Sequence, residues 1–260
     1  MLDFERIRNI FPKEIGGESK FYKYIVREYL QLMILDYLFY TPFYNKVVLI
    51  GGANLRIIQE IDRFTEDIDF DCRNLSREDF VSMTNDIALY LKNRDIYVET
   101  IENTKLNMKA FERILYFPHL QLCRDAISDD IISFKLKIQA QDQGVSYKPD
   151  RAYVDKDIFR FYVNIPPLDV LCAMKLISIL MRNSSSDYYD IPFLLSKTPP
   201  NIDFVKVKLG ITSQEILKRL LIERLRNVDL EKKKKWIDRL LFNGASADRI
   251  SKIRQVIGSM

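Results

Sequence analysis

The sequence is poor in the residues that build thiol and imidazole sites. It has one histidine, His119, and three cysteines, Cys72, Cys123 and Cys172, with no CxxC spacing among them. One histidine cannot form a histidine-rich metal centre, and scattered cysteines predict neither a disulfide framework nor a zinc site. We therefore interpret the cysteines as reduced thiols, as is typical of a cytoplasmic protein, and His119 as a structural or surface residue.

The chain also lacks a long apolar run and a secretory signal. Its most apolar stretch, residues 29–43, is short and contains Gln31 and Asp36, so it predicts a buried helix and not a membrane span. The first residues, MLDFERIRNIF, carry charges throughout, unlike a signal peptide. Internal repeats and low-complexity segments are absent from the sequence. We expect a cytoplasmic protein with no membrane partner.

The composition indicates a folded protein of one large or two small domains. The 260 residues are 47% hydrophobic, 12% aromatic and 29% charged, which is enough to bury a sizeable core. The net charge of +4 permits an anionic partner without requiring one. Residues 218–235 hold eight basic and three acidic side chains. Two interpretations of this segment stay open: a solvated helix face, or a surface that follows RNA phosphates.

Hydrophobic periodicity predicts an α+β fold with a small mixed β-sheet, an N-terminal helix and a helical C-terminal half. We expect a core with N-terminal helices at residues 1–150 and a helical C-terminal domain at residues 151–260. Ser19 and Ser76 are the expected N-caps of their helices. Strands are expected at residues 46–50, 67–72, 96–101, 111–117 and 131–141, and helices at residues 19–40, 53–60, 76–93, 168–182, 187–196, 212–227, 229–243 and 246–258.

Two short motifs carry the candidate chemistry. Gly51 and Gly52 end the first expected strand and precede a helix, so the backbone can approach a phosphate where no Cβ obstructs it and free N–H groups are available. The second motif is the acidic strand that begins at residue 67. Two-residue alternation places the carboxylates of Asp67, Asp69 and Asp71 on one face of that strand.

Neighbouring carboxylates repel one another unless a cation neutralises them. Mg²⁺ prefers carboxylate oxygens together with substrate phosphates, and a pair of such ions about 3.5–4 Å apart can clamp the attacking and leaving oxygens in phosphoryl transfer. Asp67 and Asp69 are therefore candidate ligands of Mg²⁺ or Mn²⁺. The alternative is an exposed acidic strand that faces water.

The combination of a glycine pair and a DxD strand resembles the polymerase-beta-like nucleotidyltransferase superfamily. The strings GGANLR at residues 51–56 and DRFTEDIDFD at residues 62–71 are similar to the GGTALR and RFSEDIDFD patterns of the AbiEii/AbiGii toxin family. The resemblance covers about residues 20–200. It implies a nucleotidyltransferase in which Gly51, Gly52, Arg56 and Thr65 belong to the nucleotide-binding residues.

A downstream match extends the resemblance. The family has a helical lysine, an arginine seven residues later and an RDxxD element, and Lys175, Arg182, Asp187 and Asp190 stand at the corresponding positions. Helical spacing places the lysine and the arginine on one face. On the family's account Lys175 contacts the nucleotide phosphates, Arg182 assists binding, and the two aspartates complete the catalytic set. The alternative for Lys175 is a lysine that snorkels from an apolar helix.

Two departures from the family pattern bear on activity. Ser186 replaces the arginine of the RDxxD element. The strand at residues 134–139 falls where many members carry a further acidic residue, and here it offers Lys137 and Gln139. Neither side chain can bind a metal ion as a carboxylate. The aspartates of the RDxxD element are the candidate replacements, and without one the enzyme would be weak or inactive.

The resemblance implies an NTP-dependent nucleotidyltransferase similar to the toxins of type IV toxin–antitoxin systems, with Mg²⁺ or Mn²⁺ as cofactor and pyrophosphate as a product. It further implies an RNA acceptor, such as a tRNA 3′ end, and a cognate antitoxin. Two alternatives stay open: transfer to a small-molecule or protein hydroxyl, and a degenerate protein that binds a nucleotide or a partner. The expected catalytic set is Asp67, Asp69, Lys175, Asp187 and Asp190.

Overall fold

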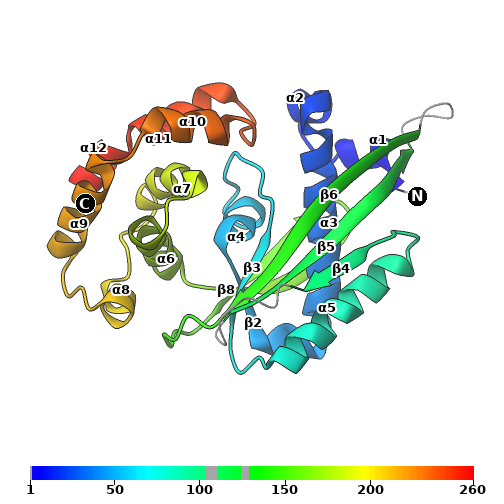
Figure 1. Ribbon diagram of the computed structural model, residues 1–260, viewed down its shortest axis with the longest axis horizontal. Helices are drawn as coiled ribbons and strands as arrows, with labels where there is room; N and C mark the ends of the chain where they lie inside the picture. The colour runs from blue at the N-terminus through cyan, green and yellow to red at the C-terminus, as the bar shows by residue number, and fades with distance from the viewer. Residues whose placement is uncertain (1, 103–109, 124–128) are drawn as a thin grey trace. The chain divides into compact units, whose positions relative to one another are not determined.

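The computed structural model describes residues 2–102, 110–123 and 129–260, and the side chains of all of these except 121–123 and 129–131 (Figure 1). Contacts divide the chain into two units. Unit 1 comprises Met1–Ala53, Thr65–Gln143 and Arg151–Ile165, and unit 2 comprises Asn54–Phe64, Gly144–Asp150 and Pro166–Met260. These limits differ from the boundary expected at residue 150, because residues 151–165 pack within unit 1 and residues 54–64 within unit 2.

Unit 1 is built on a mixed β-sheet of strand order β1-β5-β6-β3-β2, with β4 also paired to β5. Strand β3 runs parallel to β6 and antiparallel to β2, so the predicted mixed sheet is confirmed. The position of β3 between β6 and β2 gives its residues hydrogen-bonded neighbours on both sides. The strands are β1 (Leu2–Asp3), β2 (Val47–Ile50), β3 (Ile68–Cys72), β4 (Glu99–Glu102), β5 (Ala110–Cys123) and β6 (Asp129–Gln141).

A two-stranded hairpin, β7 (Asp150–Lys156) and β8 (Phe159–Ile165), was not expected from the sequence. Phe159, Phe161 and Val163 are buried and alternate with exposed Arg160 and Tyr162. This two-residue period is the signal of a half-buried strand, and the prolines on either side concealed it because they indicated a connection. The buried face of β8 packs on β2 and α3, which explains why the hairpin belongs to unit 1.

Helix α3 (Tyr22–Phe39) is the expected buried helix. It packs against the sheet and against α5 (Arg77–Lys92), as Figure 1 shows. Its start differs from the prediction, since Ser19–Phe21 forms a 3-10 turn and Phe21 precedes the helix without a side-chain cap. The expected N-cap role of Ser19 is therefore wrong. The remaining helices of this part are α1 (Phe4–Arg8) and α2 (Lys13–Gly16), and α4 (Gly51–Ile57) carries the chain from unit 1 into unit 2.

Unit 2 is helical apart from its connecting segments, which confirms the expected helical C-terminal half. One helix, α8, was missed, although Asn201 caps its start and Gly210, with φ +72°, ends it. The expected last helix is divided in two at Lys252. The helices are α6 (Leu168–Met181), α7 (Ser185–Leu195), α8 (Ile202–Leu209), α9 (Gln214–Arg226), α10 (Leu230–Asp238), α11 (Asp248–Ser251) and α12 (Ile253–Gly258).

The cysteines and the histidine lie where no chemistry is expected of them. Cys72 and Cys172 are buried free thiols, and burial raises the pKa of each to about 12. Such thiols stay protonated and unreactive. The side chain of Cys123 lies outside the described part of the structure, and His119 is exposed on β5. Among the described residues, no helix combines the length and the apolar character that crossing a membrane requires.

The predicted N-cap of α5 is confirmed and yields a stability test. The Ser76 hydroxyl accepts the Asp79 N–H at 3.1 Å, and the Asp79 carboxylate accepts the Ser76 N–H at 3.1 Å. Ser76→Ala removes one of these bonds and should lower the free energy of unfolding by about 1 kcal/mol. Urea unfolding measures this change. Ser82→Ala, an exposed position of the same helix, is the control, and an equal loss in both variants would contradict the capping role.

Candidate active site

The glycine turn and the acidic strand come together in unit 1. Strand β2 ends at Ile50, which is the register partner of Asp69 on β3. Gly51 follows with φ +69°, a conformation that residues with a Cβ rarely adopt. A Cβ at this position would lie 2.5 Å from Oδ2 of Asp69. Two features therefore favour glycine at position 51: the positive φ angle, and the Asp69 carboxylate that occupies the space of a Cβ.

The three aspartates at and just before β3 have different surroundings. Ile68 and Phe70 are buried on the opposite face, as two-residue alternation predicts. Asp71 is 2% exposed and accepts the backbone N–H of Gln143 at 2.9 Å, so its carboxylate supports the structure. Asp67 and Asp69 are partly exposed. These two carboxylates are the ones within reach of a ligand from solvent.

Helix α3 fixes the segment that leads into β3. The Gln31 amide donates to the carbonyl of Asp67 at 3.4 Å and lies 3.5 Å from the carbonyl of Thr65. Arg27 of the same helix donates to the Glu66 carboxylate at 3.1 Å. Thr65 is buried at this point, and Gly52 is partly exposed at the start of α4. The nucleotide-binding roles of Thr65 and Gly52 remain predictions.

Strand β6 brings a cation to the carboxylates. Lys137 Nζ lies 3.3 Å from Oδ2 of Asp67 and 3.8 Å from Oε2 of Glu112. Burial lowers the pKa of Lys137, but attraction to Asp67, Asp69 and Glu112 outweighs it and holds that pKa above its usual value. Burial raises the pKa of Asp67, and Lys137 offsets part of this rise. Gln139, the other residue that departs from the family pattern, is the register partner of Asp69.

A metal ion that uses Asp67 and Asp69 would need few protein ligands. Mg²⁺ is commonly held by one or two carboxylates and completes its shell with water and substrate phosphates. The pair therefore fits one hard divalent ion shared with a nucleotide. Within the described part of the chain, no group of three histidine, cysteine or acidic side chains could hold a metal ion by itself.

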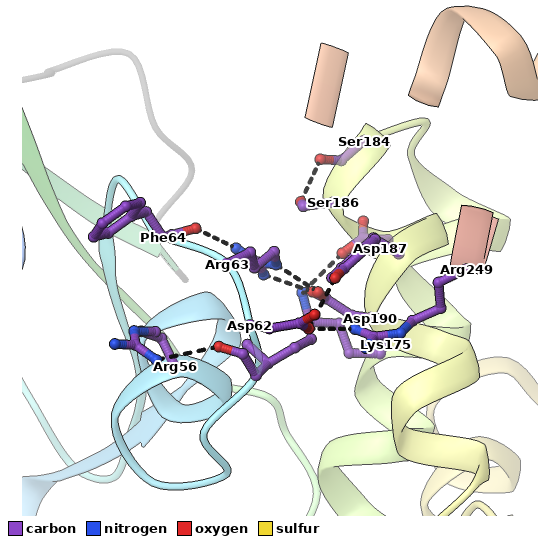
Figure 2. A network of polar contacts seen from close by, with 12 residues as sticks. Arg56, Asp62, Arg63, Phe64, Lys175, Ser184, Ser186, Asp187, Asp190 and Arg249 are labelled. Carbon is purple, nitrogen blue, oxygen red and sulfur yellow. Dashed lines mark hydrogen bonds and ion pairs between the residues drawn. The ribbon is translucent and has the colours of Figure 1, made fainter. Parts of the chain in front are cut away.

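Unit 2 contains a buried network of ion pairs, shown in Figure 2. Lys175 Nζ of α6 lies 2.9 Å from Oδ1 of Asp187 and 2.7 Å from Oδ2 of Asp190, both on α7. Arg63 donates to both oxygens of Asp190, at 2.7 and 2.8 Å. Arg182 donates to Asp187 at 3.1 Å from the C-cap of α6, where the backbone is extended. Arg182 therefore does not share a helix face with Lys175, contrary to expectation.

The centre of the network is largely closed to water. Asp187 and Asp190 are completely buried, and the side chain of Lys175 is 5% exposed. Burial raises the pKa of Asp190, but Arg63 and Lys175 outweigh it and hold that pKa below its usual value. The carboxylates of Asp187 and Asp190 similarly outweigh burial and raise the pKa of Lys175. The ammonium of Lys175 is thus held by two carboxylates, and its contact with nucleotide phosphates remains a prediction.

Arg63 is a site residue that sequence reasoning left without a role. It lies in the segment 54–64, which unit 2 holds at several points. The Phe64 N–H donates to the Leu240 carbonyl at 2.8 Å, and Asp62 accepts from Arg249 at 2.7 Å and from the Tyr189 hydroxyl at 2.8 Å. The available signal was an arginine close to an acidic motif that needs compensating charge.

Two further residues of the family pattern are placed within unit 2. Arg56 donates to the Ile61 carbonyl at 3.3 Å, and its guanidinium lies 4.4 Å from the centre of the Phe242 ring. Its role in nucleotide binding remains a prediction. Ser186, which replaces an arginine of the family pattern, lies with its hydroxyl 3.0 Å from that of Ser184 (Figure 2).

The buried network predicts a large and pH-dependent contribution to stability. Asp190→Asn removes the carboxylate that pairs with both Arg63 and Lys175 and leaves Lys175 with Asp187 alone, so the free energy of unfolding should fall by about 3–5 kcal/mol. Because the pKa of Asp190 lies below the ordinary 3.8, the wild-type contribution is present above that pH and is lost as the pH falls through the lowered value. Urea unfolding at several pH values measures both effects.

The isosteric control for this variant is Asp238→Asn, at an exposed aspartate of the same unit. It should change the free energy of unfolding by less than about 0.5 kcal/mol. Equal losses of unfolding free energy in the two variants at pH 7 would contradict a large contribution of the network to stability.

Comparison with known proteins places this geometry in a family. The family model described as "Nucleotidyl transferase AbiEii toxin, Type IV TA system" matches residues 34–249. No curated protein matches the sequence significantly. Solved structures that are similar in fold include the two described next, and their low identities extend the likeness no further than the fold.

One is MenT4, a nucleotidyltransferase toxin from Mycobacterium tuberculosis H37Rv, with 13% identity, a TM-score of 0.56 and coverage of 100% of this chain and 91% of that chain. The other is a putative nucleotidyltransferase from H. pylori, with 17% identity, a TM-score of 0.53 and coverage of 91% of this chain and 95% of that chain. The family match spans both the acidic strand of unit 1 and the buried network of unit 2. This chain therefore belongs to the AbiEii nucleotidyltransferase toxin family of type IV toxin–antitoxin systems and is an NTP-using nucleotidyltransferase.

Proposed function

We propose that the chain transfers a nucleoside monophosphate from an NTP to a hydroxyl of RNA, such as a tRNA 3′ end, and releases pyrophosphate. The reaction requires Mg²⁺ or Mn²⁺ bound to Asp67 and Asp69. The observation that carries the proposal is the fit between Gly51 and Asp69, where a Cβ would come within 2.5 Å of the carboxylate. A turn that must lack a side chain, next to a partly exposed carboxylate, suits a phosphate and its metal ion better than it suits a structural role.

In this proposal the residues of the chain position the acceptor hydroxyl and the phosphates for the reaction. The acceptor hydroxyl forms a bond to the α-phosphorus while the bond from this phosphorus to the bridging oxygen breaks, and pyrophosphate leaves with that electron pair. The backbone at Gly51 and Gly52 approaches the phosphates, and a carboxylate of the Asp67 and Asp69 pair accepts the hydroxyl proton. The bound divalent ion would supply neutralisation of the phosphate charge.

The residues of unit 2 enter the proposal through the family pattern. Lys175 and Arg182 are assigned to the nucleotide phosphates, and Asp187 and Asp190 to the catalytic set. Direct contacts support one part of this assignment, since both aspartates hold the ammonium of Lys175 in place. A lysine whose charge is maintained in a buried position is suited to a fixed electrostatic task.

An RNA acceptor agrees with the basic character of the C-terminal helices. Residues 218–235 carry eight basic and three acidic side chains, and Lys232 and Lys235 are exposed on α10. Phosphate contacts of this kind predict RNA binding that weakens as the salt concentration rises. The family further suggests a toxin that acts in the cytoplasm and is opposed by a cognate antitoxin. Growth arrest on expression, relieved by the product of a neighbouring gene, would support this role.

One observation favours a degenerate, non-catalytic member. Lys137 and Gln139 lie on the strand where many family members carry a further acidic residue, and the ammonium of Lys137 pairs with Asp67. Such a protein would bind a nucleotide or a partner without transfer. Transfer to a small-molecule or protein hydroxyl is the other alternative, and absence of the salt-sensitive RNA binding expected of a phosphate-tracking surface would point to it.

The transfer assay separates these possibilities. The purified full chain is incubated with total tRNA, Mg²⁺ and each labelled NTP in turn. We expect label on RNA from the wild type, and a loss of about a hundredfold or more in Asp67→Asn and Asp69→Asn, since metal stabilisation of phosphoryl charge is worth several kcal/mol. Asp155→Asn, at an exposed aspartate of unit 1, is the matched control and should keep full activity. Nucleotide binding without label on RNA would reject the RNA acceptor.

Gly51→Ala tests the fit of the turn against the carboxylate. The added Cβ must displace Asp69 and strain a backbone with φ +69°, so transfer should fall to the level of the aspartate variants. Gly210→Ala is the control, because it has φ +72° but no atom within 4 Å of its Cβ. It should lose about 1 kcal/mol of stability and keep its activity. Equal transfer rates in the two variants would contradict the proposed site.

A further inference from the structure

Lys137 is the one departure from the family pattern that contacts the proposed metal ligands. Its Nζ lies 3.3 Å from Asp67 and 3.8 Å from Glu112, and it is also attracted to Asp69. The strand register brings these side chains together. Gln139 of β6 is the register partner of Asp69 on β3 and of Glu112 on β5. Lys137 lies two residues before Gln139, on the same face of β6.

The charges around Lys137 define how many metal ions the site can take. Asp67, Asp69 and Glu112 contribute three negative charges, and Lys137 contributes one positive charge. The remaining charge of −2 equals that of one divalent cation. A glutamate at position 137 would give −4, the charge that a pair of divalent metal ions neutralises.

We propose that Lys137 is a fixed cation that takes the place of a second divalent metal ion, so that this site binds one metal ion where an acidic residue at position 137 would allow two. The inference rests on the proposed function in that it takes Asp67 and Asp69 as the metal ligands. It goes beyond that function because it assigns a role to the residue that would otherwise mark the protein as degenerate.

The chemistry of lysine suits this role. An ammonium is a compact point charge with three donors, and it neutralises oxygen atoms without the multiple ligands that a metal ion requires. The side chain of Lys137 is 31% exposed, so the charge can act on a bound nucleotide as well as on the carboxylates. A purely structural ion pair at this exposure would contribute little to stability and would leave metal binding unchanged.

The test is Mn²⁺ binding to the full chain in the absence of nucleotide, followed by the electron paramagnetic resonance of free Mn²⁺. The wild type and Lys137→Arg should bind at most one ion. Lys137→Gln removes the competing charge and should bind Mn²⁺ about tenfold more tightly, and Lys137→Glu should bind one ion more than the wild type. Lys135→Gln, which removes the same charge two residues earlier on β6, is the matched control and should resemble the wild type.

Two bound ions on the wild-type chain would overturn the inference, as would equal affinities and stoichiometries in the wild type, Lys137→Gln and Lys137→Glu. Asp67→Asn should abolish the gain when it is combined with Lys137→Glu, and a gain that persists without Asp67 would overturn the inference as well. Failure of the proposed transfer reaction is a separate result, because it would appear as absent label on RNA while the change in Mn²⁺ binding remained.

Discussion

The constraint on which the rest of unit 1 depends is that an internal strand of its sheet carries carboxylates. Strand β3 buries Ile68 and Phe70, and Asp69 lies on its other face, next to Asp67 at its start and between two hydrogen-bonded neighbouring strands. Each neighbour adapts to these charges. After β2 the chain turns through a glycine beside Asp69, and β6 contributes Lys137 beside Asp67. A glycine of the family motif and a lysine that departs from the family pattern thus both lie against negative charge on an internal strand.

Unit 2 solves the same electrostatic problem in the opposite way. In unit 1 the carboxylates stay partly exposed and available, whereas Asp187 and Asp190 are completely buried and already neutralised by basic side chains. Breaking such a buried pair is far more costly than weakening an exposed one. The two settings differ for aspartates that look alike in the sequence: one pair is partly exposed, and the other surrounds a buried lysine.

The sequence predicted the mixed sheet, the helical C-terminal half, the α5 cap and the meeting of the glycine turn with Asp69, because each depends on local periodicity or on a motif. It missed the β7–β8 hairpin, where flanking prolines masked the alternation, and α8, which is short. It also missed the partners of Lys137 and Arg63. Those depend on strand register and on helix packing between residues far apart in the chain, such as Arg63 and Asp190, and no local pattern encodes them.

Residues 54–64 belong to unit 2, while the chain on both sides of them belongs to unit 1. The polypeptide therefore enters unit 2 and forms hydrogen bonds there with Leu240 and Tyr189. It returns to unit 1 at Thr65, two residues before Asp67. No single cut can divide the chain into two complete modules. Gene fusion or truncation between residues 150 and 166 would remove the partners of Asp62 and Arg63, so recombination between relatives can exchange the two units only together.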